Sequence, residues 1–438
     1  MTLATPITVI RGRFLDIQKT VAQANQIADQ VRYLEDGVMI TEQGKIRWFG
    51  TWNDAQDHLP INIEIQHYPE QLIIPGMIDT HIHFPQTEMV GAYGEQLLSW
   101  LNTYTFPTEI QFKDKAYASE IAKFFVNELL KNGTTTALVF CTVHPESVDA
   151  LFEAAEQHQM RLIAGKVMMD RHAPEALCDS ADSSYDDSKA LIEKWHGQGR
   201  ALYAITPRFA PTSTPEQLER AGQLKAEHPD VYVHTHLSEN KDEIAWVKDL
   251  FPAQKGYLDV YHHYGLTGQR SVFAHCVHLE DAEWQCMHET DSAIAFCPTS
   301  NLFLGSGLFP LKKTWQQQVK VGLGTDIGAG TSFSLLQTVN EAYKVQQLQG
   351  DKLSAYESLY HATIGGAKAL DLDDKLGNFN VGKEADFVVL NIKPTALQQL
   401  RQSRSKSLED SLFALFTMGD DRNVEATYIY GQKAYSQN

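Results

Sequence analysis

Residues 72–83 read Leu-Ile-Ile-Pro-Gly-Met-Ile-Asp-Thr-His-Ile-His, a short apolar run that ends in polar side chains. His81 and His83 are two positions apart. Because side chains alternate along a strand, both imidazoles should face the same side of it. An apolar strand with such a polar carboxyl end is typical of α/β enzymes, which build their sites where parallel strands end.

Seven further apolar runs follow, separated by amphipathic stretches. The eight runs are 72–82, 137–140, 162–169, 202–206, 231–236, 271–275, 293–296 and 320–324. Between them, residues 118–129, 215–228 and 240–251 place apolar side chains on one helical stripe, and Gly133 suits the end of the first helix. Eight strand–helix units predict a (β/α)₈ barrel, which we expect over residues 71–375.

Both ends of the chain have β character. In residues 1–70, short β-like runs at 8–14 and 37–49 are separated by glycine and aspartate or asparagine. The tail, 376–438, returns to this pattern at 387–390 and 426–430. We therefore expect the two ends to complete one small β domain, a sheet or sandwich beside the barrel.

Composition excludes several classes of function. The 438 residues include 37 Lys and Arg against 55 Asp and Glu, and the resulting net charge of −18 opposes binding to nucleic acid or anionic membranes. Residues 1–16 lack the pattern of a secretory signal, so we expect a cytoplasmic protein. Five cysteines without a C-x-x-C pair predict reduced thiols rather than disulfides or a cysteine-bound zinc.

Polar side chains end three more of the runs. The fifth ends in His234-Thr-His236-Leu-Ser-Glu239, the sixth in His275 and the eighth in Asp326. Two alternating histidines alone are weak evidence, but four such strand ends meeting at one barrel face predict a divalent metal site. Three imidazoles and a carboxylate would bind the ion, and another imidazole and carboxylate would remain for proton transfer. Such ligands favour Zn²⁺ and leave Fe²⁺ or Mn²⁺ open.

Other candidate residues have simpler interpretations. Asp79 and His234 share the inward parity but lie deeper, so we expect them to support the ligands by hydrogen bonds or packing. Residues 377–383 imitate a phosphate loop, but Glu384 replaces its Ser or Thr, so a turn is expected. Cys297 should be an ordinary thiol. We also expect ordinary roles for His144, His172, His278 and His361.

Two sets of motifs resemble known families. Residues 75–83, His236, His275, Asp326 and the segment 382–390 together resemble the amidohydrolase superfamily. The segments 85–86, 98–109, 207–211 and 234–240 are similar, more narrowly, to the guanine deaminase family. The resemblance spans nearly the whole chain.

The resemblance implies one Zn²⁺ per subunit, with Fe²⁺ possible. It assigns the ion to His81, His83, His236 and Asp326, and contact with the attacking water to His275. Relatives with two metals usually bridge them with a lysine of the fourth strand, and residues 201–208 contain none. Lys166, on the third strand, is interpreted as structural.

The activity implied is hydrolytic deamination of free guanine to xanthine and ammonia, with attack of a zinc-activated water at C2. Its catalytic residues would be Glu239, His275 and Asp326, with Glu239 shuttling the proton. Gln86 and Arg208 suit the amide edge and N7 of guanine, and Phe209 suits its ring. The full expected substrate-binding set is Gln86, Trp100, Leu101, Arg208, Phe209, His236 and Glu239. The resemblance also implies a homodimer.

Two alternatives remain open. One is another deaminase or chlorohydrolase of the superfamily that acts on a different amino-heterocycle, such as a pterin, triazine or cytosine. The other is a non-catalytic, metal-stabilised barrel that serves as an interaction protein. Glu239 argues against the second, because a purely structural metal site needs no additional acid.

Overall fold

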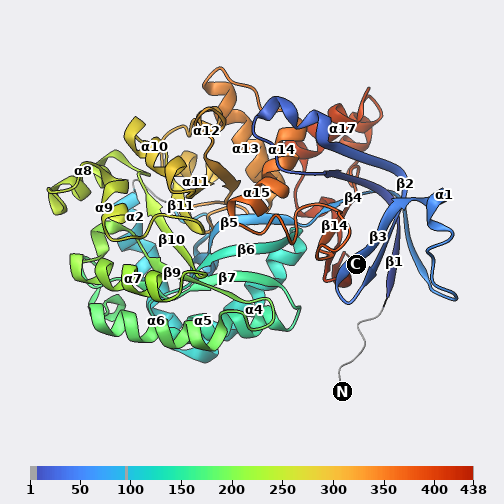
Figure 1. The fold of residues 1–438 in the computed structure, drawn as a ribbon. Coiled ribbons are helices and arrows are strands. Elements are labelled where there is room, and N and C mark those ends of the chain that lie inside the picture. The colour runs from blue at the N-terminus through green and yellow to red at the C-terminus, as the bar shows by residue number, and fades with distance from the viewer. Residues whose placement is uncertain (1–6, 94–96, 438) are drawn as a thin grey trace.

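The computed structural model describes residues 7–93 and 97–437 of the chain. Within them the strands form a nine-stranded sheet and a seven-stranded sheet. Figure 1 shows the first sheet curled among surrounding helices and the second, built from the beginning and end of the chain, to one side of it.

The larger sheet is the predicted (β/α)₈ barrel, which is confirmed. Its neighbouring strands pair in parallel, in the order β5 (Met77–His83), β6 (Thr134–Phe140), β7 (Arg161–Gly165), β9 (Leu202–Pro207), β10 (Tyr232–Leu237), β11 (Ser271–His275), β12 (Ala293–Phe296) and β13 (Lys320–Leu323). The short β8 (Val167–Met168) also pairs with β9. Two hydrogen bonds connect the first strand, β5, with β13 and the residues that follow it. Thr80 Oγ1 donates to Leu323 O at 3.0 Å, and Asp326 N donates to His81 O at 2.9 Å.

The first apolar run, predicted as one strand, is two. Residues 72–75 close β4 (Ile65–Pro75), which belongs to the smaller sheet, and the barrel strand β5 begins at Met77. Gly76 joins them, and a Cβ at this position would lie 2.0 Å from Thr135 Oγ1. Only glycine therefore allows the chain to pass from one sheet to the other so close to β6. The third run is similarly interrupted at Lys166, between β7 and β8.

The three predicted barrel helices are confirmed. They are α4 (Lys115–Lys131), α7 (Pro215–Glu227) and α8 (Lys241–Leu250). The others are α5 (Pro145–Glu156), α6 (Ala181–Trp195), α9 (Tyr257–His263), α10 (Asp281–Glu289), α11 (Pro298–Phe303), α12 (Leu311–Gln317), α13 (Leu335–Leu348), α14 (Ala355–Ala362) and α15 (Ile364–Ala369). Among the described residues, no helix combines the length and apolarity that crossing a membrane requires.

The smaller sheet unites the two ends of the chain, as expected. Its order is β16 (Gln432–Ser436), β15 (Val424–Ile429), β14 (Phe387–Leu390), β4, β1 (Thr8–Ile17), β2 (Val31–Glu42) and β3 (Lys45–Thr51). The predicted run 37–49 is a hairpin that turns at Gln43 and Gly44, both with positive φ. The tail also contains α16 (Ala396–Gln402) and α17 (Leu408–Met418), which the β pattern did not predict.

A buried ion-pair network joins the tail to the bottom of the barrel. Glu384 accepts from Arg161 and Arg200 at 2.5 Å each, and Arg200 also pairs with Asp386. The segment that imitates a phosphate loop is a turn, as predicted, with positive φ at Gly377 and Gly382. Glu384, which follows this turn, therefore connects the C-terminal tail to the barrel through its ion pairs with Arg161 and Arg200.

Candidate active site

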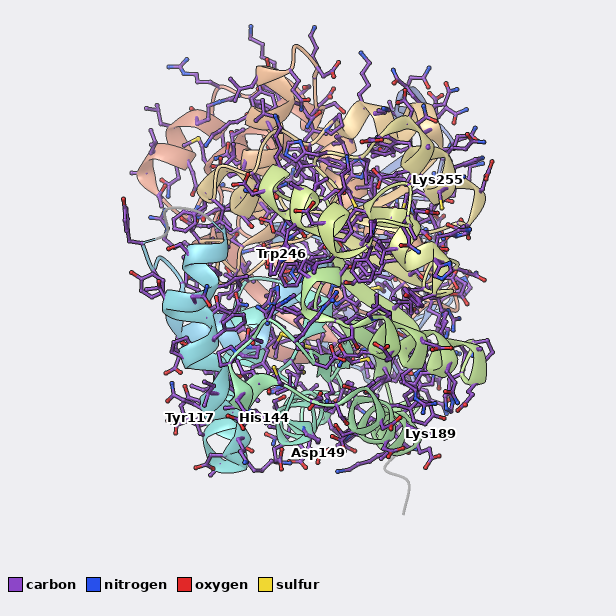
Figure 2. All side chains as sticks on the ribbon, turned by 90° about the vertical axis from the view of Figure 1, so that its left-hand side faces the viewer. Tyr117, His144, Asp149, Lys189, Trp246 and Lys255 are labelled. Carbon is purple, nitrogen blue, oxygen red and sulfur yellow. The ribbon has the colours of Figure 1, made fainter. Side chains whose placement is uncertain are left out.

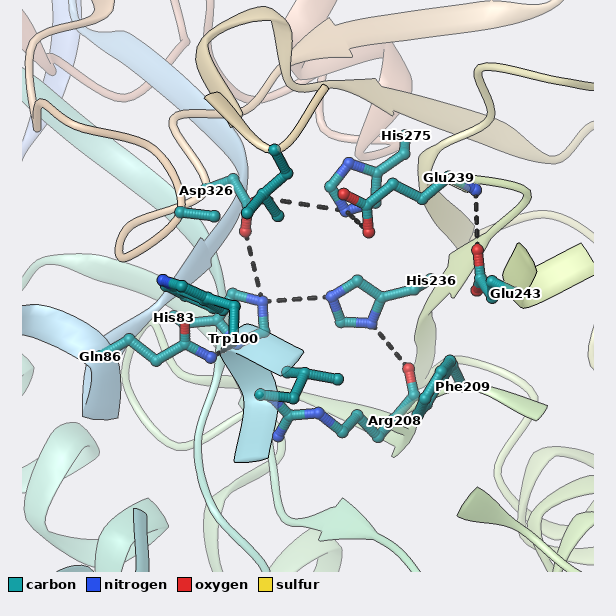
Figure 3. A pocket seen from close by; sticks show the side chains of 13 residues that line it. His83, Gln86, Trp100, Arg208, Phe209, His236, Glu239, Glu243, His275 and Asp326 are labelled. Atoms are coloured by element: carbon teal, nitrogen blue, oxygen red, sulfur yellow. Dashed lines mark hydrogen bonds and ion pairs between the residues drawn. The ribbon is translucent and has the colours of Figure 1, made fainter. Parts of the chain in front are cut away.

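The four polar strand ends meet at the carboxyl face of the barrel (Figure 3). His83 Nε2 lies 3.2 Å from His236 Nε2 and 3.4 Å from Asp326 Oδ1. His81 Nε2 lies 3.1 Å from the same Asp326 oxygen. β5, β10 and the segment after β13 thus bring three imidazole nitrogens and one carboxylate to a common point.

These four side chains fit a divalent metal ion. Ligand atoms about 2.1 Å from a tetrahedral ion lie roughly 3.4 Å from one another, close to the separations found here. His81 Nε2 is fully buried and has no hydrogen-bond partner among the described residues. A bound metal ion would satisfy this nitrogen. Burial lowers the pKa of His81, His83 and His236 well below the usual histidine value, so these rings are neutral, the form that binds metals.

Neighbouring groups orient the imidazoles. His236 Nδ1 lies 2.7 Å from the Arg208 carbonyl oxygen, which can only accept, so the ring donates from Nδ1 and keeps an Nε2 lone pair for a metal. His81 Nδ1 lies 2.8 Å from His234 Nε2. Asp79 accepts from the His81 backbone N–H at 3.1 Å. Asp79 and His234 therefore contact His81, one of the candidate metal-binding side chains, by hydrogen bonds, as expected.

The remaining imidazole and carboxylate lie beside this cluster. His275 Nε2 is 3.6 Å from Glu239 Oε2 and 3.8 Å from Asp326 Oδ2. Asn301 Oδ1 accepts from His275 Nδ1 at 2.9 Å, and Ser306 Oγ donates to Glu239 Oε1 at 3.0 Å. His275 and Asp326 both have positive φ, 71° and 51°, a strained conformation that often marks functional sites.

The surroundings shift the pKa values of these proton-carrying groups. Burial raises the pKa of Glu239 and of Asp326. For His275, burial alone would lower the pKa, but the Glu239 and Asp326 carboxylates and the Asn301 hydrogen bond outweigh it, and the pKa is raised. Shifted pKa values on an adjacent carboxyl group and imidazole are typical of groups that transfer protons in active sites.

A pocket opens beside the cluster, and all seven predicted substrate-binding residues line it. The lining consists of His83, Gln86, Trp100, Leu101, Arg208, Phe209, His236, Glu239, Glu243, His275, Leu304, Asp326 and Ala329. Helix α8 lies beside this end of the barrel, and Figure 2 labels its Trp246 near the middle of the face in view. The Trp246 ring lies 6.2 Å from that of Phe209, edge to face.

Two lining residues share one buried carboxylate that the sequence did not single out. Glu109 ends α3 (Phe106–Glu109), and its carboxylate accepts from Arg208 Nη1 at 2.8 and 3.0 Å and from Gln86 Nε2 at 3.2 Å. Asn301, Ser306 and Glu243 were also missed. All four lie on loops or helices without a recognisable pattern, although Glu109 ends a segment that carried the family resemblance.

Several other residues behave as expected outside the cluster. Lys166 is buried and pairs with Asp179, and Cys297 is a buried thiol whose pKa burial raises well above normal. The lining of this pocket does not include His144, His172, His278 or His361.

Comparison with known proteins agrees with the geometry. The model of the amidohydrolase family matches residues 72–434. Guanine deaminase of Escherichia coli strain K12 is 62% identical over 432 residues, which cover 99% of this chain and 98% of the relative. The solved structure of an E. coli guanine deaminase has a TM-score of 0.96 at 60% identity, covering 99% of this chain and 100% of that one.

A second solved structure is guanine deaminase from C. acetobutylicum with guanine bound in its active site. It has a TM-score of 0.88 at 30% identity and covers 98% of this chain and 100% of that one. With a matching family model over most of the sequence and relatives this similar along its whole length, the chain belongs to the amidohydrolase family and, within it, to the guanine deaminases.

Proposed function

We propose that this protein catalyses the hydrolytic deamination of guanine to xanthine and ammonia, with one zinc ion held by His81, His83, His236 and Asp326. The observation that carries the proposal is the carboxylate of Glu239 beside His275 in a pocket next to four convergent metal-binding side chains. The 62% identity to E. coli guanine deaminase and the guanine bound to the C. acetobutylicum enzyme support the choice of substrate.

The metal would activate the water, and side chains of the protein orient it and transfer protons. When bound, a divalent ion of this kind acts as a Lewis acid and brings the pKa of water toward about 7. His275, held by Asn301, orients the attacking water and accepts a proton at Nε2. Asp326 faces the same nitrogen and stabilises the positive charge that results.

Glu239 carries the proton onward. Addition of water to C2 of guanine is followed by cleavage of the bond from C2 to the exocyclic nitrogen. Glu239 passes to ring N3 the proton that His275 accepts from the water. It then transfers the proton of the resulting C2 hydroxyl to the amino group, so that the C2–O double bond forms as the amino group leaves as ammonia rather than as an amide anion. Burial raises the pKa of Glu239, which favours its protonated form and so its role in carrying protons.

The experiment measures metal content, ammonia release and xanthine formation together. Wild type should convert guanine in the metal-loaded form, and Glu239→Gln should keep its metal but lose roughly 10²- to 10⁴-fold in kcat. The exposed Glu289→Gln is the matched control and should leave turnover unchanged. Near-normal turnover by Glu239→Gln would contradict the assignment.

A panel of substrates separates the alternatives. Pterin, triazine and cytosine derivatives should release ammonia far more slowly than guanine. Tightly bound metal with no hydrolysis of any compound would instead favour a non-catalytic barrel. Metal analysis of the purified protein distinguishes zinc from iron.

We also infer a homodimer, which the family resemblance favours, and a cytoplasmic location. Sedimentation at micromolar concentration would show a species of twice the chain mass of 49.2 kDa. Cell fractionation checks the location.

A further inference from the structure

We propose that Glu109 sets the hydrogen-bonding polarity of the substrate pocket and thereby its preference for the N1–H and O6 edge of guanine. Glu109 would be a positioning residue that acts through Gln86 and Arg208. The proposal rests on the function proposed above. It names the residue that decides which edge of a purine the pocket recognises by hydrogen bonds.

Glu109 lies behind the pocket wall rather than in it. Its side chain is about 1% exposed, and it is not among the residues that line the pocket. It nevertheless contacts two lining residues, because its carboxylate accepts from Arg208 Nη1 at 2.8 and 3.0 Å and from Gln86 Nε2 at 3.2 Å. The buried carboxylate thus pairs with the charge of a buried guanidinium and holds a neutral amide at the same time.

Two of the three polar contacts of Gln86 fix the orientation of its amide. A carboxylate can only accept, so the atom that faces Glu109 must be the NH₂ group. The Gly328 backbone N–H can only donate, and it lies 3.2 Å from Gln86 Oε1. The third neighbour is His83 Nδ1, 3.2 Å from Gln86 Nε2. If His83 Nε2 binds the metal, Nδ1 carries the ring proton and cannot accept from this NH₂ group, so the orientation rests on the contacts with Glu109 and Gly328.

The groups left for a ligand match a lactam edge. Among the described residues, the Nε and Nη2 groups of Arg208 have no hydrogen-bond partner, and Gln86 Oε1 has one of its two lone pairs free. An arginine N–H can donate to O6 of guanine, and the free lone pair can accept from N1–H. A purine without O6, whose N1 is itself an acceptor, meets two mismatched groups.

Replacement of Glu109 by glutamine should reverse this polarity. The new amide would present its oxygen to Arg208 in place of Glu109 Oε2 and its NH₂ group to Gln86 in place of Oε1. Gln86 would then turn its own oxygen toward this NH₂ group and give up the hydrogen bond from the Gly328 N–H. Gln86 would offer the pocket a donor, which suits N1 of 2-aminopurine better than N1–H of guanine. Glutamine has nearly the shape of glutamate, so the change tests polarity rather than volume.

The experiment compares guanine with 2-aminopurine, which carries the same C2 amino group but lacks O6 and N1–H. In metal-loaded wild type, kcat/KM should favour guanine by about 10³-fold or more, since sites built around a hydrogen-bonding group reject analogues that lack it. In Glu109→Gln the ratio should fall at least ~10-fold, mostly through KM for guanine.

Glu384→Gln is the matched control. Glu384 is also a buried carboxylate bound by arginines, but it lies at the opposite end of the barrel. Its replacement should lower thermal stability and leave the substrate ratio at the wild-type value. Glu109→Asp provides a second test, because the shorter side chain keeps the charge but cannot reach both Gln86 and Arg208, and it should reduce the ratio by a smaller factor.

The outcomes are distinct. A ratio that falls in both Glu109 variants and not in Glu384→Gln supports the inference. An unchanged ratio in Glu109→Gln overturns it, and if that variant does not fold, an unchanged ratio in Glu109→Asp overturns it. Wild type that releases no ammonia from guanine refutes the proposed function, and the inference fails with it, whereas an active wild type with unchanged variant ratios refutes the inference alone.

Discussion

Glu243 should make the stability of this protein depend on pH below neutrality. Its carboxylate is buried at the start of α8, where Oε2 accepts from the backbone N–H groups of Glu239 and Asn240 and Oε1 accepts from Tyr257 Oη. Burial, and then the nearby Glu239 carboxylate, raise the pKa of Glu243 to about 7 from 4.5. The folded protein therefore holds this proton more tightly than the unfolded chain does.

The direction follows from linkage. Below pH 4.5 the group is protonated in both states and contributes nothing to the pH dependence. Between pH 4.5 and about 7 the folded state binds more protons, so the free energy of unfolding decreases as the pH rises. At about 1.4 kcal/mol per pKa unit, the full cost of ionising Glu243 in the folded state is about 3 kcal/mol above pH 7.

Glu243→Gln should remove this dependence. Its oxygen can accept from the two backbone N–H groups while its NH₂ group donates to Tyr257, so the local contacts survive. The unfolding midpoint of the variant, relative to wild type, should rise by a few degrees between pH 5 and pH 8. Scanning calorimetry at both values, with identical metal content, measures the difference.

A surface carboxylate provides the comparison. Glu153→Gln removes a half-exposed group that pairs with Lys115, and its midpoint relative to wild type should be nearly the same at the two pH values. If Glu243→Gln behaves like Glu153→Gln, burial does not hold a proton on Glu243 in the folded protein, and the reasoning is wrong.

Two further predictions concern buried contacts. Arg200→Met leaves Asp386 and Glu384 without a shared cation and should lower the free energy of unfolding by about 3–5 kcal/mol. The value of kcat/KM for guanine should not change. Denaturant unfolding and steady-state kinetics measure the two quantities, and a change in kcat/KM would contradict the structural role. Asn301→Ala removes the acceptor that orients His275 and should lower kcat about 10- to 100-fold with little change in melting temperature. Asn301→Asp keeps an acceptor at this position and should retain most of kcat. Equal losses of kcat in both variants would show that the orientation of His275 is not the cause.

The convergent side chains could be predicted because strand geometry constrains them strongly. His81 and His83 must share a face if they lie on one strand, and the ends of parallel barrel strands must meet. The structure accordingly brings His81, His83, His236 and Asp326 together. Alternation and barrel closure are properties of the backbone, so they can be recognised in a sequence without any knowledge of packing.

Glu109 and Asn301 could not be found this way. Glu109 ends the short α3 and Asn301 lies in α11, and each acts through a contact with a residue far away in sequence. The break at Gly76 was missed for a related reason, since an apolar run continues through it and only the proximity of Thr135 requires glycine. Features that depend on tertiary contacts produce no periodic pattern in the local sequence.

Arg208 would couple substrate recognition to metal binding in the proposed site. Its backbone oxygen accepts from His236 Nδ1, while its side chain pairs with Glu109 at the wall of the substrate pocket. The peptide group thus orients a metal-binding imidazole, and the guanidinium remains available to the base. Because one buried residue would perform both tasks, a purine held by Arg208 would lie at a fixed position relative to His236. That fixed relation, rather than either contact alone, is what would place C2 of guanine near the metal-binding side chains and Glu239.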